Sequence, residues 1–228
     1  MHTGQTPSKK IILFMTLMYT RSHEVVSVPH QKSEFYLFPL TNVNLFPSTT
    51  KPLQIFEERY IQMIQDSISK KIAIAICFVP EGSQEIRPIA GYGFPQIIET
   101  KPDGTLIIFI SCVGKALLDL QNLKSIEPYL VAEGKHITES HDVDTHHADQ
   151  LLKLSQVLVR WIKKHVQNQA QQDIFLRSLI GSKEIVSAFA AYLVTDYDLQ
   201  YELIQMHSIN KQIEFLYRLF ESGELTNK

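Results

Sequence analysis

Residues 35–63, FYLFPLTNVNLFPSTTKPLQIFEERYIQM, decide the fold of this chain. Two short apolar segments in this stretch are punctuated by prolines, Pro39 and Pro47. Because proline fixes φ and lacks an N–H, we expect both prolines at strand ends or edges. An amphipathic helix is expected to begin near Phe56, since apolar side chains recur there at helical spacing. The stretch predicts a strand, a loop and a helix that closes one end of a sheet.

The residues after this stretch predict several more short strands. Residues 72–79, IAIAICFV, form a continuous apolar run that is typical of a strand buried on both faces. The turn at 101–105, KPDGT, is the clearest hairpin signal, because proline presets φ and glycine supplies a positive φ. Further strands are expected over 88–92, 94–99, 105–112 and 129–133. Short strands at near-regular spacing suggest a small closed or half-closed barrel.

The composition changes after a polar bridge at 135–147. Apolar residues then recur at helical spacing, and Ser182, Asp196 and Ser208 stand where they could cap three of the helices. Helices are expected over 148–166, 174–180, 183–194 and 199–206, with a last helix from 209 onward. These patterns predict a bundle of about four or five helices that packs on the barrel.

The predicted fold class is therefore α+β: a small β-barrel domain with one inserted helix, followed by an all-α helical bundle. The expected divisions are an extension at 1–34, the barrel at 35–134, the bridge at 135–147 and the bundle at 148–222.

The extension contains an apolar run at 11–19, preceded by Lys9 and Lys10. The run is too short to span a bilayer, which takes roughly 20 residues. It is similar to the start of a signal peptide, but no small-residue cleavage site follows it. Two alternatives stay open: a later translation start, at Met15 or Met18, and an arm that docks on a partner.

The charge balance argues against electrostatic binding of nucleic acid. The chain carries 22 Lys+Arg and 24 Asp+Glu, and basic residues do not outnumber acidic ones in either half. Cys77 and Cys112 both lie in apolar runs, which predicts two reduced, buried thiols rather than a disulfide framework. The composition is that of a soluble globular protein, and we expect it to be cytoplasmic.

Several ordered motifs resemble the amino-terminal, substrate-binding domain of the ATP-dependent Lon proteases. The matching residues are Phe38-Pro39-Leu40, Leu45-Phe46-Pro47, Pro52-Leu53, Ile55-Phe56-Glu57, Arg59-Tyr60 and Met63. The resemblance covers residues 35–222, its specific part is 36–63, and it implies a PUA-like β-barrel. Two positions depart from the family pattern. Ala90-Gly91-Tyr92-Gly93 replaces the usual glycine step, and Lys115-Ala116 stands where the family often has arginine and phenylalanine.

No catalytic motif accompanies this resemblance. The phosphate-binding pattern G-x-x-x-x-G-K-[ST], the G-x-S-x-G elbow and the cysteine-protease signatures are all absent from the sequence. The resemblance therefore implies a stand-alone form of the domain, without ATPase or protease regions, that uses no ATP and no cofactor. We expect a non-catalytic module rather than an enzyme.

The resemblance also implies which partners the protein has. They are unfolded or tagged protein segments, or a protein adaptor, in protein quality control or proteolysis. A peptide-binding surface needs exposed apolar side chains with a polar rim. The candidate residues lie in loops and strands next to proline or glycine: Phe46, Pro47, Pro52, Tyr92 and Phe94. A homo-oligomer also stays open. We expect Arg59 to pair with the barrel wall or a terminal carboxylate, because residues two apart on a helix do not face each other and Glu57 is therefore excluded.

Two other functions are open at this point. One is RNA binding, which other proteins with PUA-like barrels perform, although a fold alone does not give a function. The other is metal-dependent hydrolysis by the segment 136–147, which is rich in His, Asp and Glu. Imidazole and carboxylate groups are metal ligands, and His141, His146 and His147 are the candidates. The segment lacks the ligand spacing of a zinc finger or a helical metalloprotease.

Overall fold

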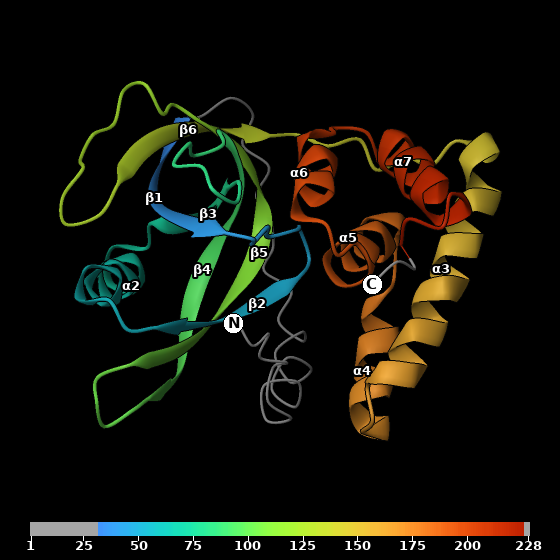
Figure 1. The fold of residues 1–228 in the computed structure, drawn as a ribbon, viewed down its shortest axis with the longest axis horizontal. Coiled ribbons are helices and arrows are strands. Elements are labelled where there is room, and N and C mark those ends of the chain that lie inside the picture. The colour runs from blue at the N-terminus through green and yellow to red at the C-terminus, as the bar shows by residue number, and fades with distance from the viewer. Residues whose placement is uncertain (1–31, 226–228) are drawn as a thin grey trace.

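The computed structural model describes residues 32–225, and the expectations for the earlier extension lie outside them. Figure 1 shows a barrel next to a helical part. The strands are β1 (Lys32–Thr41), β2 (Thr50–Ile55), β3 (Ala73–Val79), β4 (Ile89–Thr100), β5 (Leu106–Leu118) and β6 (Val131–Ile137). The helices are α2 (Glu58–Lys70), α3 (Thr145–His165), α4 (Gln169–Ser178), α5 (Ser182–Leu193), α6 (Tyr197–Gln205) and α7 (Ile209–Glu221). The predicted α+β class, with a barrel before a helical part, is confirmed.

The sheet closes on itself. Its strand order is β2-β5-β4-β3-β1-β6, and β5 also pairs with β6. β1 and β3 are parallel, and the other strand pairs are antiparallel. Five strands therefore form a ring, and β2 is added to β5. β2 and β6 share one edge of β5, because β2 pairs with residues 106–111 and β6 pairs with residues 115–118.

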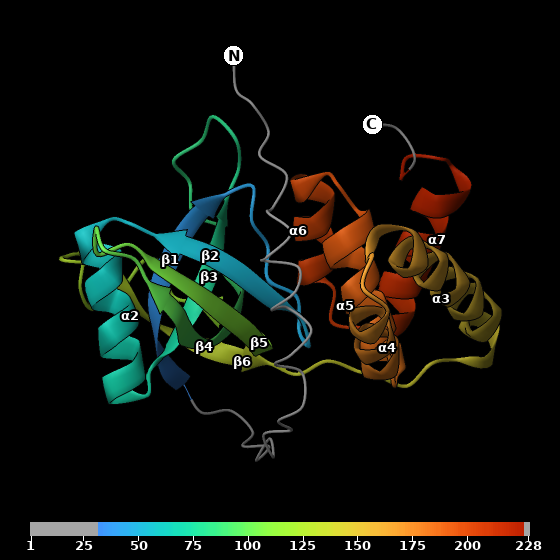
Figure 2. The same ribbon diagram turned by 90° about the horizontal axis from the view of Figure 1, so that it is seen from below.

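The central strand β3 is buried along its whole length, as the apolar run predicted. Alternate side chains of a strand point to opposite faces. Ile74 and Ile76 pack in a cluster with Met63 of α2, whereas Ala75 and Cys77 belong to a second barrel cluster. Helix α2 covers the end of the barrel that lies away from the helical part (Figures 1 and 2). It is the helix that the opening stretch of sequence predicted to close one end of the sheet.

Three features of the barrel differ from the sequence expectations. A strand, β2, forms where a loop was expected to lead into the helix; Pro52 is accommodated because β2 pairs with β5 alone. The segment 43–46 forms no strand, and the chain at Leu45 instead crosses close to Gly91. A Cβ at Gly91 would lie 1.8 Å from the Leu45 carbonyl oxygen, so only glycine fits there. β4 is one strand rather than two. Its register with β5 shifts between Tyr92 and Gly93, where the extra residue is Val113 of β5.

Two strands extend further than predicted. β5 continues beyond residue 112 through Lys115 to Leu118, and β6 ends at Ile137, inside the expected polar bridge. Pairing between these two extensions closes the ring. Local polarity predicted strand ends here, but the ladder hydrogen bonds of a closed sheet outweigh that preference.

The start of α2 corrects one prediction. Glu57 is the N-cap residue, with an extended backbone (φ −77°, ψ 129°), and it therefore lies outside the helix. Its side chain turns back to the guanidinium group of Arg59, where Nη2 lies 2.8 Å from Oε2. The expectation that these two residues do not meet was wrong, because the spacing rule applies to residues within the helix.

Of the three residues predicted to cap helices, only Asp196 makes capping hydrogen bonds with its side chain. Asp196 caps α6 as predicted, since its Oδ1 accepts the backbone N–H groups of Asp198 and Leu199 at 2.9 and 3.0 Å. Gly181, not Ser182, is the N-cap residue of α5. Ser208 occupies the N-cap position of α7, but its side chain makes no capping hydrogen bond.

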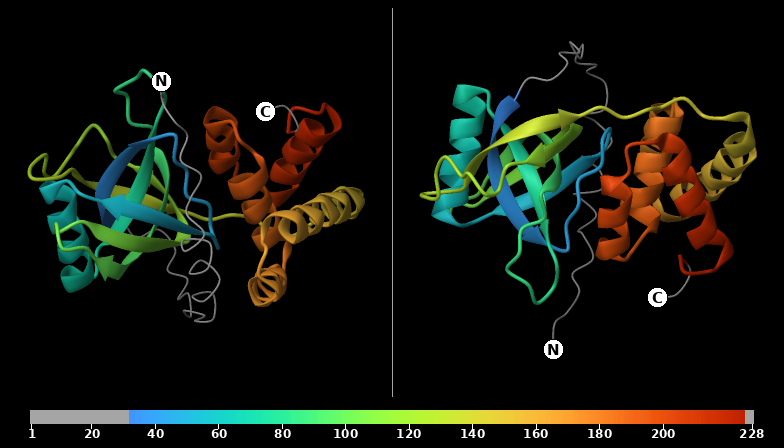
Figure 3. Two further views of the ribbon diagram at one scale, coloured as in Figure 1. Left: turned by 60° about the horizontal axis from the view of Figure 1, so that its bottom comes forward. Right: turned by 90° about the horizontal axis from the view of Figure 1, so that it is seen from above.

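The helical part packs directly on the barrel. α6 lies next to the barrel, while the link after β6 runs along one side of the molecule to the more distant α3 (Figure 3). The main core cluster of the helices includes Phe46 and Phe78 from the barrel, and Phe78 stacks on Tyr201 of α6 with ring centroids 5.4 Å apart. Within residues 32–225, no helix is long and apolar enough to cross a membrane.

Candidate functional site

A groove on the outside of the barrel is a candidate binding site. Its volume is about 580 Å³. A second hollow of about 240 Å³ adjoins it and shares Ile86 and Leu120. The groove is lined by the segment before β4, the end of β5 and the facing strands: Lys32, Glu85, Ile86, Pro88, Leu117, Leu118, Asp119, Leu120, Gln121, Glu133, Gly134 and Lys135. We call this hollow the barrel groove.

The register of β5 explains the apolar floor of the barrel groove. Ala116 and Leu118 point into the barrel core, so Leu117 points outward between Ile89 of β4 and Lys135 of β6. Leu117 is 46% exposed although it lies in the middle of the pairing between β5 and β6. Within residues 32–225, no side chain covers this outward leucine completely, so part of its apolar surface lines the barrel groove.

The rim of the barrel groove carries charges of both signs. The Lys32 ammonium lies 3.4 Å from a carboxylate oxygen of Glu133, and Lys124 lies 3.0 Å from the other oxygen. The hydrogen bond from Lys124 lowers the pKa of the Glu133 carboxyl below its usual value. Across the groove, Glu85 pairs with Arg87 at 3.3 Å. The rim is therefore polar and close to charge-balanced, like the rim of a protein interface.

A second exposed surface lies on the outer face of β2, β5 and β4. Phe94, Ser111 and Thr50 are paired across the three strands, and the next row contains Phe109 and Pro52. We call these five residues the outer sheet face. Phe94 is 48% exposed, whereas Phe109 is buried. The hydroxyls of Thr50 and Ser111 share a hydrogen bond of 2.9 Å.

The strand edges beside the outer sheet face are poor places for adding another strand. β2 pairs only with β5, and β4 beyond Gly93 also pairs only with β5 among the described strands. Both edges contain a proline, Pro52 or Pro95, and β4 has a bulge after Ile97. Prolines and bulges block edge-to-edge pairing. Binding at this side therefore relies on side chains.

The five predicted binding residues do not form one surface. Phe94 and Pro52 share the outer sheet face. Phe46 is 4% exposed, and it lines a small cavity between barrel and helices together with Pro47, which is also buried. Tyr92 is half-buried and packs on Phe35 with ring centroids 5.0 Å apart. The expectation that Phe46 lies at an exposed loop was wrong, because the helical part covers it.

The three candidate metal ligands are not brought together. His141 lines the small cavity between barrel and helices, whereas His146 and His147 lie at the start of α3, with ring centroids 5.3 Å apart. The Nδ1 atom of His147 lies 3.9 Å from an Asp144 carboxylate oxygen. Residues 32–225 contain no group of three His, Cys, Asp or Glu side chains arranged to hold a metal ion.

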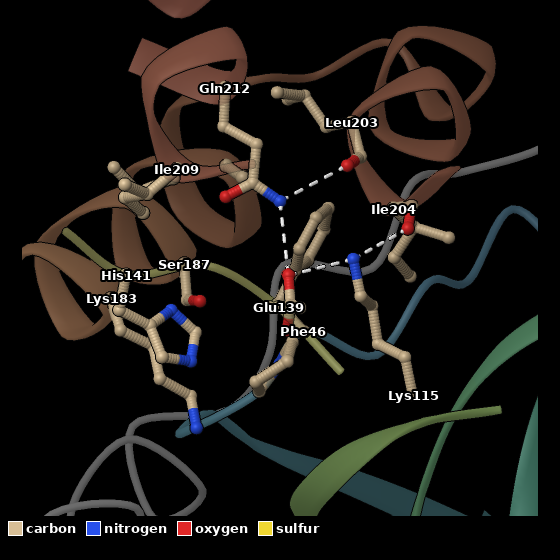
Figure 4. A pocket seen from close by; sticks show the side chains of 13 residues that line it. Phe46, Lys115, Glu139, His141, Lys183, Ser187, Leu203, Ile204, Ile209 and Gln212 are labelled. Atoms are coloured by element: carbon tan, nitrogen blue, oxygen red, sulfur yellow. Dashed lines mark hydrogen bonds and ion pairs between the residues drawn. The ribbon is translucent and has the colours of Figure 1, made fainter. Parts of the chain in front are cut away.

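The small cavity holds an interaction that the sequence analysis did not predict. Its volume is about 10 Å³, and Lys115 reaches it from β5 (Figure 4). The Lys115 ammonium donates to the carbonyl oxygens of Ile204 and Met206 at 2.8 and 2.7 Å, and it lies 2.8 Å from Oε1 of Glu139. The only signal in the sequence was a lysine in place of the family's arginine.

Both cysteines are buried free thiols, as predicted. Burial raises the pKa of each thiol, Cys77 and Cys112, to about 12. A thiol with so high a pKa is not a nucleophile near neutral pH, because the thiolate is the reactive form.

Known proteins share this architecture. The pattern of the family described as the ATP-dependent protease La (LON) substrate-binding domain matches residues 34–222. The Lon protease of Buchnera aphidicola subsp. Acyrthosiphon pisum (strain APS) is 21% identical over 192 residues, which cover 82% of this chain. The matched region is 24% of that protein, so the chain spans about a quarter of the relative's length.

Two solved structures are similar in fold. The Lon N-terminal domain protein from Xanthomonas campestris has a TM-score of 0.61 and 17% identity, covering 82% of this chain and 98% of that one. The N-terminal domain of Mycobacterium avium complex Lon protease has a TM-score of 0.61 and 11% identity, covering 83% and 98%. With the family pattern matching most of its length, this chain belongs to the family of the ATP-dependent protease La (LON) substrate-binding domain.

Proposed function

We propose that this chain binds segments of other polypeptides in the barrel groove, as a non-catalytic recognition module. The observation that carries the proposal is the exposed Leu117 in the lining of a hollow of about 580 Å³ that charged side chains also line. Ligand sites are typically concave and apolar with a few polar groups at their edges. Membership of a substrate-binding family supports polypeptide as the ligand.

The mode of binding follows from the shape of the barrel. The prolines and the bulge at the free strand edges disfavour a ligand that pairs as an extra strand. A segment in the barrel groove instead places apolar side chains against Leu117, Ile86 and Leu120, and polar groups along the rim. Burying one such side chain contributes about 1.5–3 kcal/mol, so a few of them support weak, reversible binding.

The proposal extends to the role of the module. Segments with exposed apolar side chains are found in unfolded or tagged proteins, which are the clients of protein quality control. We assign the chain a role in presenting such clients, or a protein adaptor, for proteolysis, and a cytoplasmic location in keeping with that role. Unfolding and cleavage are outside the proposed activity.

The test is a binding titration with the full chain and a labelled, permanently unfolded protein, read by fluorescence anisotropy. Leu117→Ser is expected to weaken binding about fivefold or more, because the lost side chain contributes of order 1 kcal/mol or more. The matched control is Leu152→Ser, at a leucine of α3 that is 56% exposed and lies far from the barrel groove. It is expected to bind like the wild type.

Other outcomes have clear meanings. Unchanged affinity in Leu117→Ser together with a loss in Phe94→Ala would move the site to the outer sheet face. No measurable binding by the wild-type chain would reject polypeptide recognition itself.

A further inference from the structure

Lys115 is a buried cation in the wall of the barrel. It lies on β5 opposite Gly91 of β4 and Ile137 of β6, and it is 1% exposed. An ammonium group has three N–H donors and no acceptor. Lys115 has three oxygen partners within 2.8 Å: the Ile204 and Met206 carbonyls and the Glu139 carboxylate. Each donor therefore has a partner.

Those partners belong to different parts of the molecule. The two carbonyls lie at the carboxyl end of α6, where the helix dipole favours a cation. Glu139 comes from the link between barrel and helices, and its Oε1 also accepts from Nε2 of Gln212 on α7 at 3.3 Å. Figure 4 shows Lys115, Glu139 and Gln212 converging on this point. One lysine of the barrel thus connects to the link and to α6 directly, and to α7 through Glu139.

The other contacts between the two parts are single hydrogen bonds and apolar packing. The Asn44 side chain donates to the Tyr197 carbonyl oxygen at 3.0 Å, the Ser48 hydroxyl to a Glu184 carboxylate oxygen at 3.2 Å, and the Ile89 N–H to the Tyr201 hydroxyl at 3.3 Å. Phe46 and Phe78 enter the apolar core of the helices. Apolar contact is proportional to buried area and tolerates sliding or rotation. The two hydrogen bonds from the buried ammonium to the end of α6 have fixed directions, and both are lost if α6 shifts by a bond length.

Stability alone does not explain a lysine at this place. Taking two charges out of water costs several kcal/mol per ion, and apolar replacement of a buried pair is often neutral or stabilising. Desolvation lowers the pKa of Lys115 despite the opposing effect of Glu139, which shows that burial disfavours the charged form. We therefore attribute the role of this interaction to the fixed directions of its hydrogen bonds rather than to stability.

We propose that Lys115 fixes the orientation of α6 and α7 on the barrel. In its absence the helices still pack on Phe46 and Phe78, but in a broader range of orientations. The proposal is independent of polypeptide binding, because Lys115 itself does not line the barrel groove.

The test measures a distance between the two parts in the full chain. Spin labels are placed on cysteines introduced at Gln96 of β4 and Gln156 of α3, which are both exposed. The native thiols are buried and stay unlabelled in the folded protein. The variant is Lys115→Met, an unbranched side chain one atom shorter than lysine that removes the charge. The matched control is Lys124→Met, at a lysine in exposed ion pairs.

The distance distribution in Lys115→Met is expected to be at least about twofold broader than in the wild type, and Lys124→Met is expected to match the wild type. Superimposable distributions for Lys115→Met and the wild type would overturn the proposal. If Lys115→Met does not fold, Glu139→Gln takes its place, since it keeps an acceptor for Lys115 and weakens the pair. Broadening in Glu139→Gln supports the proposal, and an unchanged distribution overturns it.

Discussion

Lys115 and Leu117 lie on the same face of β5, two residues apart, yet their surroundings are opposite. Both point out of the barrel, because Ala116 and Leu118 point in. The helical part covers the cation, which is 1% exposed, and leaves the leucine 46% exposed. In most folded proteins the leucine would be buried and the lysine exposed. The difference separates a position used to orient two parts of the molecule from a position available to a ligand.

The largest expected effect comes from removing the acid beside the covered cation. Glu139→Ala leaves Lys115 buried with its charge uncompensated, and we expect the free energy of unfolding to fall by about 3 kcal/mol. Urea denaturation followed by circular dichroism measures the change. Glu133→Ala removes the acid of an exposed pair on the barrel groove, and its effect is expected to be much smaller. Equal losses in the two variants would contradict the comparison.

A smaller effect is expected in the pH dependence of stability. The pKa of Lys115 is lower in the folded protein, chiefly because of desolvation. Between the folded and the unfolded pKa, the unfolded state binds more protons, so this group makes stability rise with pH. In urea titrations from pH 7 to 10, the wild type is therefore expected to gain stability relative to Lys115→Met. Parallel curves for the two proteins would show that the pKa of Lys115 is not lowered by folding.

The smallest effect on stability is expected at the uncovered leucine. Leu117→Ser is expected to change the free energy of unfolding by no more than about 0.5 kcal/mol, since exposed positions tolerate substitution. Its neighbour Leu118 is buried in the barrel, and Leu118→Ser is expected to cost about 2–4 kcal/mol. Similar losses in both variants would mean that Leu117 is a packing residue rather than a contact for a ligand.

The sequence predicted elements whose signals are local. The hairpin turn has Gly104 at φ +84° and a hydrogen bond from the Gly104 N–H to the Lys101 carbonyl oxygen, as its composition indicated. The apolar run became the buried strand β3, and Asp196 caps its helix. Each of these features depends on a few neighbouring residues.

The features that the sequence did not reveal depend on distant contacts. β2 forms because its residues pair with β5. Pro52 lies within it, so the local sequence predicted a loop there instead of a strand. Phe46 is buried because helices from the other end of the chain cover it. The barrel groove combines residues from β1, β5, β6 and the segment before β4, and no spacing along the chain connects them. The sequence predicted that Lys115 ends a strand. In the structure, the two carbonyl groups that it contacts lie 89 and 91 residues further along the chain.

The shared edge of β5 has a consequence for motion in the barrel. The ring is closed by residues 115–118 of β5 pairing with residues 134–137 of β6, followed by a hydrogen bond from the Asp119 N–H to the Glu133 carbonyl oxygen at 2.8 Å. Regions held by few contacts open first in native proteins. This seam of four residue pairs, like the β3–β4 pairing of three, is therefore expected to open more readily than the longer pairings of the barrel. A ligand in the barrel groove touches both sides of the seam, at Leu117 and Lys135. Binding of such a ligand is expected to stabilise the pairing of β5 with β6. Hydrogen exchange of the backbone amides along the seam would then slow, even though the ligand makes no bond to the backbone there.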